Sequence, residues 1–324
     1  MIFFNDLVLK AGCLGLLVFR KLKKFIPVIK FFVMFKSISV YINYLIHENG
    51  KFLYSLSICA ILKNEADYIK EWIEYHRIAG ADHFYLYDDN STDNLLDILK
   101  PYIDEGIVTY KKLNGEWMQV LAYNNAIKKY KNKSKWMAFI DIDEFIVPLN
   151  KEKIQNVLDY VENTVVKRKI FGMIVYTVSY GYSGHYNKPS GLVIENYTKS
   201  DGIDVFKTIV NPRSVVTFCG AHTAIHFFNT ALTNEKGIPF ENELYRKGID
   251  LSIASVDSIR INHYRTKSYE EYKTKIERNS KKQKNHGIVD GYTMIEYVPD
   301  YFSSKEDMVM GAYVEVLHQR LKIV

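Results

Sequence analysis

The chain has 324 residues, of which 48% are hydrophobic and 25% charged, a composition typical of a globular protein with a sizeable core. Its formal net charge is +6, but residues 1–50 hold seven basic and two acidic side chains, so the other 274 residues together carry +1. Since a nucleic-acid-binding domain carries a basic stripe on its folded body, this distribution argues against nucleic acid as a partner. The three cysteines are far apart and odd in number, which predicts reduced thiols in a cytosolic protein.

Residues 1–50 are predicted to form a separate leader on a membrane surface. The apolar stretches 7–19 and 25–35 each contain a lysine, so neither reaches the roughly 18 uninterrupted apolar residues of a membrane-spanning helix. Beside the basic run 20–24, they are typical of a helix that lies on an anionic membrane surface. The alternative is an ordinary N-terminal helix packed on the core. The first interpretation predicts a cytoplasmic protein that is peripheral on the inner face of the cell membrane.

Residues 51–150 alternate between strand and helix patterns. Short apolar runs predict strands at 53–62, 83–87, 106–110 and 136–140. Apolar side chains at helical spacing predict helices at 68–78, 95–102 and 119–131. This alternation predicts an α/β fold, in which a mostly parallel, Rossmann-like sheet is flanked by helices. Ligands of such sheets bind at the carboxyl ends of the strands.

The pattern becomes β-rich after residue 150. Residues 151–285 are predicted to complete the domain, and residues 286–324 to form a helical tail. The predicted strands are 170–178, 192–194, 206–210 and 258–264. The predicted helices are 151–161, 269–278 and 307–321.

Two aspartates spaced as Asp-x-Asp follow the apolar run Met137–Ile140. If the strand continues, its period of two places the side chains of Asp141 and Asp143 on one face. Two carboxylates at the end of a buried strand are costly without a positive partner. A divalent cation that carries a diphosphate is a natural partner. For so short a motif, the alternative is a pair of carboxylates that cap the next helix or face water.

Further polar clusters accompany the Asp-x-Asp motif in a fixed order along the chain. Lys63-Asn64-Glu65 and Asp88–Asp93 end strands, while Gln119 and Asn124 lie on a helix. With these clusters the chain resembles the GT-A nucleotide-sugar glycosyltransferases, and more narrowly glycosyltransferase family 92 and its bacterial relatives near family 2. The resemblance covers about residues 53–280 and rests on Lys63–His76, Tyr87–Asp93, Trp136–Phe145, Tyr180–Gly184 and Asn262–Ser268.

The resemblance implies a nucleotide diphosphate sugar as donor, UDP-linked, and a divalent cation, Mn²⁺ or Mg²⁺. It implies metal ligation by Asp141, Asp143 and His263, and a histidine ligand favours Mn²⁺. The cation would act as a Lewis acid for the departing diphosphate. The donor-binding residues that the resemblance implies are Lys63, Asn64, Glu65, Asp88, Asp89, Gln119, Asn124, Asp141 and Lys267. The histidines of Cys219–His226, His222 and His226, are weaker metal candidates.

The general base of an inverting reaction is a carboxylate that takes the proton of the acceptor hydroxyl. Glu241 and Glu243 are the candidates after the β-rich insert, and Asp201 and Asp204 lie earlier in the chain. No spacing rule chooses among them. Glu144 is predicted to point to the opposite face of the strand and to have a structural role.

The sequence therefore predicts a metal-dependent hexosyltransferase that transfers a hexose with inversion of its anomeric configuration. The acceptor would be a sugar hydroxyl of a glycan or lipid-linked molecule, as in surface polysaccharide synthesis. One alternative is a non-catalytic carbohydrate-binding relative, although such a protein would be expected to have lost Asp141, Asp143 or His263. Another is a phosphohydrolase with an aspartyl nucleophile. Those enzymes require a small or hydroxyl residue where this chain has Phe145.

Overall fold

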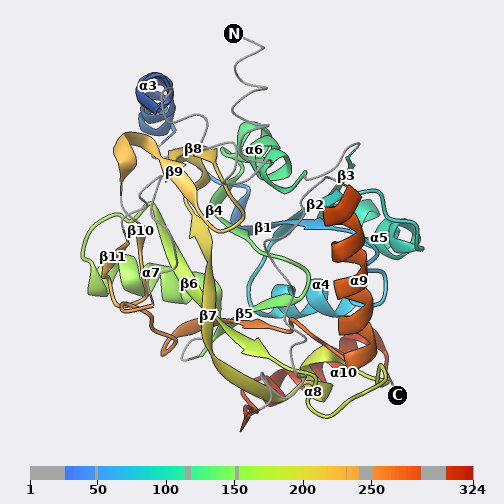
Figure 1. The fold of residues 1–324 in the computed structure, drawn as a ribbon. Helices are drawn as coiled ribbons and strands as arrows, with labels where there is room; N and C mark the ends of the chain where they lie inside the picture. Colours follow the sequence, from blue (N-terminus) through green and yellow to red (C-terminus); the bar gives the residue numbers. More distant parts are fainter. Residues whose placement is uncertain are drawn as a thin grey trace.

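The computed structural model describes residues 26–47, 50–113, 118–149, 153–230, 232–240, 251–285 and 304–323. In this part of the chain, eleven strands form one sheet that helices cover on both faces, and two further strands form a small separate sheet (Figure 1).

The first half of the sheet is parallel. Its strands are β1 (Tyr54–Leu62), β2 (His83–Asp88), β3 (Val108–Lys112) and β4 (Ser134–Phe139), in the spatial order β3-β2-β1-β4. The helices that connect them are α4 (Ile69–Ile78), α5 (Leu95–Asp104) and α6 (Gln119–Tyr130). The predicted elements of this half are confirmed in kind and order, with β3 beginning two residues later than expected.

The second half of the sheet is mixed. A long strand, β7 (Lys199–Val210), runs antiparallel between β4 and β6 (Gly172–Tyr180). Strand β12 (Ile259–His263) pairs antiparallel with β5 (Glu144–Pro148) and parallel with β6. The short strands of the sheet are β10 (Leu232–Thr233), β11 (Pro239–Phe240) and β13 (Lys305–Glu306). The predicted α/β architecture with a β-rich second half is confirmed.

The remaining elements lie outside the main sheet. The separate sheet consists of β8 (Val215–Phe218) and β9 (Ala224–His226). The remaining α-helices are α3 (Ile26–Ile46), α7 (Ile154–Tyr160), α8 (Val193–Asn196), α9 (Tyr269–Asn285) and α10 (Gly311–Leu321). A π-helical turn at Val161–Val165 continues α7, and short 3₁₀ turns lie at Pro212–Ser214 and Phe227–Asn229.

The side chains of β1 alternate between two cores because successive residues of a strand point to opposite faces. Ile58 and Ala60 belong to the large cluster that includes Trp72 of α4. Cys59 belongs to a second cluster that includes Tyr123 of α6. A strand that is buried on both faces needs a continuous apolar run, and this explains the sequence of β1.

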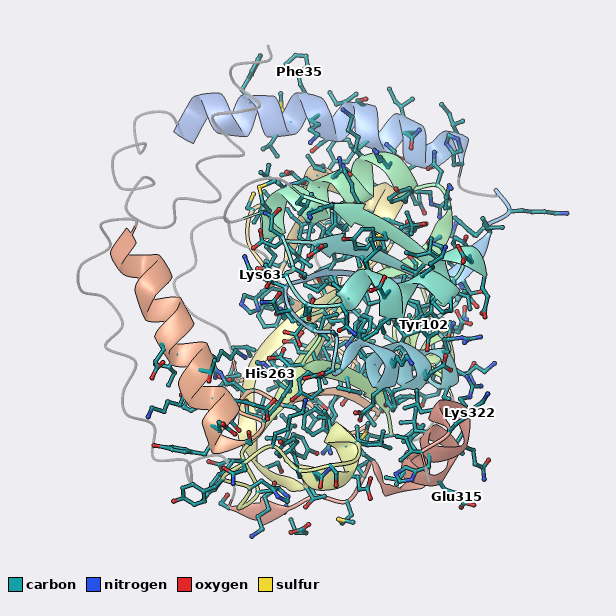
Figure 2. All side chains as sticks on the ribbon, turned by 90° about the vertical axis from the view of Figure 1, so that its right-hand side faces the viewer. Phe35, Lys63, Tyr102, His263, Glu315 and Lys322 are labelled. Carbon is teal, nitrogen blue, oxygen red and sulfur yellow. The ribbon has the colours of Figure 1, made fainter. Side chains whose placement is uncertain are left out.

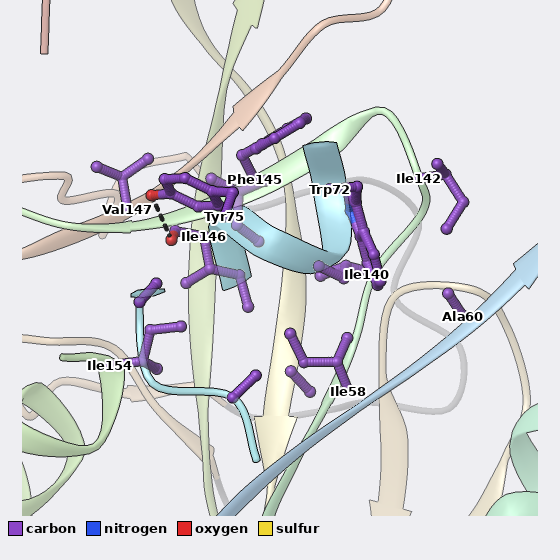
Figure 3. Close-up of a cluster of buried hydrophobic side chains, with 14 of the residues drawn as sticks. Ile58, Ala60, Trp72, Tyr75, Ile140, Ile142, Phe145, Ile146, Val147 and Ile154 are labelled. Carbon is purple, nitrogen blue, oxygen red and sulfur yellow. Dashed lines mark hydrogen bonds between the residues drawn. The ribbon is translucent and has the colours of Figure 1, made fainter. Parts of the chain in front are cut away.

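Two aromatic residues of α4 connect that helix to the segment after β4 (Figure 3). Tyr75 donates a hydrogen bond from its hydroxyl to the carbonyl oxygen of Ile146, at 3.0 Å. Trp72 donates from Nε1 to the carbonyl oxygen of Glu144, at 2.8 Å. Both side chains are fully buried, and each has its polar atom paired. The hydrophobic cluster thereby fixes the strand β5 that begins directly after the Asp-x-Asp motif.

The predicted strand 192–194 is wrong, because these residues begin the short helix α8. The backbone N–H groups of Val193 and Ile194 both donate to the carboxylate of Glu71, at 2.8 and 3.0 Å. Glu71 lies on α4 and is buried. An acidic side chain at the start of a helix satisfies N–H groups that have no partner within the helix. This long-range cap overrides the local β pattern, and burial raises the pKa of Glu71 to about 7.

Helix α3 packs on the separate sheet rather than on the main one. Val40 and Tyr44 are buried against Val216, Ile225 and Phe227. Within the described part of the chain, no helix is long and apolar enough to cross a membrane.

His76, the last residue of the first motif, has an internal role. Its Nδ1 lies 2.8 Å from the carbonyl oxygen of Trp72, and its Nε2 accepts a hydrogen bond from the N–H of Ile146, at 3.2 Å. A neutral ring that donates from Nδ1 satisfies both contacts. Burial lowers the pKa of His76 to about 3, against the effect of the Trp72 carbonyl.

Replacing His76 by Gln is expected to reduce the acid sensitivity of the fold. Because the folded pKa lies below the ordinary value of 6.5, the stability that His76 contributes is present above that pH and is lost as the pH falls towards 3. Each such group contributes a slope of about 1.4 kcal/mol per pH unit. Urea unfolding between about pH 7 and pH 5 measures this slope. His318→Gln, on the surface, should keep the slope of the natural protein, and an unchanged slope in His76→Gln would contradict the assignment.

Candidate active site

The loops after β1 and β2 lie side by side, because Leu62 and Asp88 are register partners at the ends of these strands. The N–H of Asn64 donates to the hydroxyl of Ser91 at 2.9 Å, and Asn64 Oδ1 accepts from the N–H of Thr92 at 2.8 Å. Asn64 has a φ of 56°, a left-handed conformation that asparagine adopts more readily than most residues. Two predicted donor-binding clusters therefore form one connected edge of the sheet.

Asp88 is used within the protein. One carboxylate oxygen accepts from the N–H of Ser91 at 2.8 Å, and the other accepts from the hydroxyl of Tyr110 at 2.6 Å. The residue is 3% exposed. Asp88 therefore shapes the loop, whereas its neighbour Asp89 is half-buried, and its N–H donates to the carbonyl oxygen of Leu62 at 2.8 Å.

The Asp-x-Asp motif lies in a turn, not in a strand. Strand β4 ends at Phe139 and β5 begins at Glu144. The turn is closed from both sides: the N–H of Asp141 donates to the Glu144 carboxylate at 2.9 Å, and the N–H of Glu144 donates to the carbonyl oxygen of Asp141 at 3.1 Å. The argument from the strand period is therefore wrong for Asp141 and Asp143.

Asp141 is held by a buried lysine. Lys207 Nζ, from β7, lies 2.6 Å from Asp141 Oδ2 and 3.5 Å from Glu144 Oε2. Gln119 donates from Nε2 to the other oxygen of Asp141, at 3.0 Å. The Lys207 side chain is only 3% exposed. Burial opposes its charge, but Asp141 and Glu144 outweigh burial and hold the pKa of Lys207 well above its usual value.

Asp143 is held by a second lysine and by His263. Lys275 Nζ, from α9, lies 2.8 Å from Asp143 Oδ2, and His263 Nε2 lies 3.6 Å from Asp143 Oδ1. Burial opposes ionisation, but Lys275 and then His263 outweigh it and keep the pKa of Asp143 well below its usual range. Figure 2 shows Lys63 and His263 on the side of the molecule along which α9 runs.

A third lysine lies beside the loop after β1. Lys267 Nζ is 3.5 Å from Glu65 Oε2 and 3.3 Å from the centre of the Tyr68 ring, a cation–π contact. Burial lowers the pKa of Lys267 and raises that of Glu65, while the mutual attraction of the two charges opposes both shifts. The side chain of Lys63 is half-buried at the same edge.

Some predicted residues are used elsewhere or fall outside the described chain. Asn124 Oδ1 accepts from the N–H of Phe218, and its Nδ2 donates to the Phe218 carbonyl, so Asn124 joins α6 to β8. His226 is buried beside Ser214. Glu241 and Glu243 lie outside the described residues, and Asp204 is paired with Arg265 at 2.7 Å.

Sequence reasoning missed both lysines that hold the aspartates. Lys207 stands alone in the apolar run Phe206–Val210, and a lysine at such a position is rarely buried without a partner. That isolated charge was a usable signal. Lys275 lies among charged residues of α9, where nothing in the sequence distinguishes it from a solvated face.

The residues at this edge do not form a metal site in the arrangement described. Asp141 and Asp143 each direct an oxygen to a lysine. No group of three or more His, Cys, Asp or Glu side chains is placed to hold a cation in the described part of the chain. His263 turns Nε2 towards Asp143, and its buried Nδ1 has no hydrogen-bond partner among the described residues.

The parallel half-sheet, the turn with two aspartates and the polar edge agree with the α/β glycosyltransferase architecture that the sequence motifs predict. The chain belongs to glycosyltransferase family 92, whose sequence model matches residues 54–297, three quarters of the chain.

Individual relatives are distant. A glycosyltransferase family 92 protein of Oryza sativa subsp. japonica is 27% identical over 226 residues, which are 69% of this chain and 35% of the relative. Galactan beta-1,4-galactosyltransferase GALS2 of Arabidopsis thaliana is 32% identical over 122 residues, 33% of this chain and 24% of the relative. The solved structure of S. aureus TarS in complex with UDP aligns with 49% of this chain and 47% of its own, at 18% identity and a TM-score of 0.32. The chain thus spans little more than a third of the family 92 relatives that it matches.

Proposed function

We propose that the protein is a glycosyltransferase that moves a hexose from a UDP-linked donor to a sugar hydroxyl of a glycan or lipid-linked acceptor, with inversion. The observation that carries the proposal is the pair Asp141 and Asp143, each held by a lysine at the carboxyl edge of a parallel sheet. Relatives named as galactan beta-1,4-galactosyltransferases make UDP-galactose the first donor to test.

In this proposal, residues 51–150 bind the donor and residues 151–285 bind the acceptor. Asp89 and Glu65 are the carboxylates available to accept hydrogen bonds from the base and ribose. Lys63 and Lys267 provide positive charge for the diphosphate, and a lysine near a phosphate acts as a point charge. Glu241 and Glu243 stay the candidates for the general base that takes the proton of the acceptor hydroxyl.

A divalent cation, Mn²⁺ or Mg²⁺, is part of the proposal. The three lysines that form ion pairs at this site, Lys207, Lys275 and Lys267, face four carboxylates, those of Asp141, Glu144, Asp143 and Glu65. A diphosphate therefore adds negative charge to a site that is already close to neutral, and a cation would offset it. Asp141, Asp143 and His263 are the residues that would hold this cation, provided that Lys275 leaves Asp143. When bound, the cation would stabilise the negative charge on the departing diphosphate.

Thermal melting of the purified chain tests the donor and the cation together. The ligands are UDP, GDP, CDP and UDP-galactose, each with and without Mn²⁺. A site filled well above its dissociation constant stabilises the fold by about 2–3 kcal/mol. We expect stabilisation by UDP and UDP-galactose that requires Mn²⁺. Stabilisation by UDP without Mn²⁺ would overturn the proposed role of the cation and would leave the lysines to balance the charge of the diphosphate. If no nucleotide stabilised the chain, the proposed function itself would be overturned.

A further inference from the structure

Helix α3 is apolar on two sides, and the body of the protein covers only one of them. The inner side carries Ser37, Val40 and Tyr44, which are buried. Seven further side chains of the helix are large, apolar and 43–71% exposed: Phe31, and six that we call the outer stripe, namely Met34, Phe35, Ile38, Ile42, Leu45 and Ile46.

The outer stripe is continuous along the helix. At 3.6 residues per turn, its six members fall within an arc of about 120°, on the side opposite the buried residues. Lys36, Ser39 and Asn43 lie between the two apolar sides. Figure 2 shows α3 along one edge of the molecule, with Phe35 directed away from the body. A continuous exposed apolar surface of this kind is typical of an interaction site, and the described residues of the chain leave the outer stripe 43–71% exposed.

The charge of the surrounding sequence indicates what the cover is. From residue 7 to residue 47 the chain contains seven lysines and arginines and no aspartate or glutamate. Four of the basic residues, Arg20, Lys21, Lys23 and Lys24, come directly before α3 in the sequence. A second copy of the chain would carry the same positive charge over this region, and like charges repel. An anionic surface attracts this positive charge.

We propose that the outer stripe of α3 inserts into the interface of an anionic lipid bilayer, with the helix parallel to the surface. Side chains such as Phe35, Ile38 and Ile42 would enter the boundary between head groups and acyl chains, and the positive charge of residues 7–47 would favour an anionic surface. The active-site edge would then work beside a membrane, where a lipid-linked acceptor is presented. Vesicle binding needs neither donor nor acceptor, so this inference stands or falls separately from the proposed function.

Vesicle flotation of the full chain tests the inference. The probes are vesicles of phosphatidylcholine alone and of phosphatidylcholine mixed with phosphatidylglycerol. We expect binding to the mixed vesicles only. The triple variant Phe35→Gln, Ile38→Gln and Ile42→Gln should lose about tenfold or more in partitioning, since three exposed apolar side chains no longer leave water. Glutamine keeps the helix favourable.

A matched variant controls for general loss of surface apolarity. Leu53→Gln, Leu96→Gln and Val316→Gln remove three exposed apolar side chains that lie outside α3. This control should float as the natural chain does, and both variants should melt normally. Retained binding in the α3 triple variant, or equal binding to both kinds of vesicle, would overturn the inference. If the natural chain were a dimer that did not bind vesicles, and only the α3 triple variant were a monomer, the outer stripe would be assigned to a second copy instead.

Discussion

Replacing Asp143 by Asn is expected to lower transfer from the donor by about a thousandfold or more, while the fold stays intact. The substitution keeps the shape of the side chain and removes the charge that Lys275 and His263 hold in the ionised form. The Lys275 side chain is 37% exposed, so its ammonium group can be solvated when the carboxylate is lost. The free energy of unfolding should therefore fall by less than about 2 kcal/mol. Donor turnover and urea unfolding measure the two effects.

Asp159→Asn is the matched control for this variant. Asp159 also pairs with a lysine, Lys135, at 2.8 Å, but the pair lies on the surface. We expect unchanged turnover and a stability change below about 1 kcal/mol. If Asp143→Asn turned over the donor at the rate of the control, Asp143 would have no part in holding the diphosphate or its cation.

Replacing Lys207 by Met is expected to destabilise the protein by about 3–5 kcal/mol at neutral pH. The Lys207 and Glu144 side chains are 3% and 1% exposed, so the substitution leaves a buried carboxylate without its counter-charge. Burial already raises the pKa of Glu144 against the pull of Lys207, and without the lysine the carboxyl takes up a proton more readily. Since a raised carboxyl pKa lowers stability as the pH rises above its unfolded value, the loss should shrink towards about pH 5.

Two further variants separate this effect from lost packing. Lys207→Met combined with Glu144→Gln should recover part of the stability at neutral pH and lose the pH dependence. Lys135→Met, at the surface ion pair, should change stability by less than about 1 kcal/mol. A pH-independent loss in Lys207→Met would show that shape, and not charge, is what Lys207 supplies.

The order of helices and strands in residues 51–150 could be predicted because the spacing of apolar residues in the sequence follows from which side chains are buried in the fold. Leu56, Ile58 and Cys59 are buried on two faces of one strand, and the apolar run records this directly. The family could be recognised because its motifs are polar clusters at the ends of strands, and these clusters follow one another in a fixed order along the chain. Nothing of this kind fixed the geometry inside the motif.

The details of the site depend on contacts that are distant in sequence. The turn at Asp141 is closed by the Glu144 carboxylate, so its conformation follows from a hydrogen bond and not from a period. Lys207 and Lys275 reach the two aspartates from 66 and 132 residues away. The helix α8 begins where Glu71 caps it from another helix. The local pattern can mark a lysine such as Lys207 as unusual, but it does not say which residue that lysine contacts.

The place of Lys207 on β7 limits how this protein can be recombined with its relatives. Strand β7 belongs to the β-rich half, yet it carries Lys207, the buried lysine that pairs with Asp141. Strand β5 likewise pairs with β12, Ile259–His263, in that half. A chimera that joins the first 150 residues to a foreign second half would inherit the two aspartates without their lysines. Such a hybrid would need residues 199–210 and 259–275 transplanted as one block, because these segments together set the charge balance of the motif.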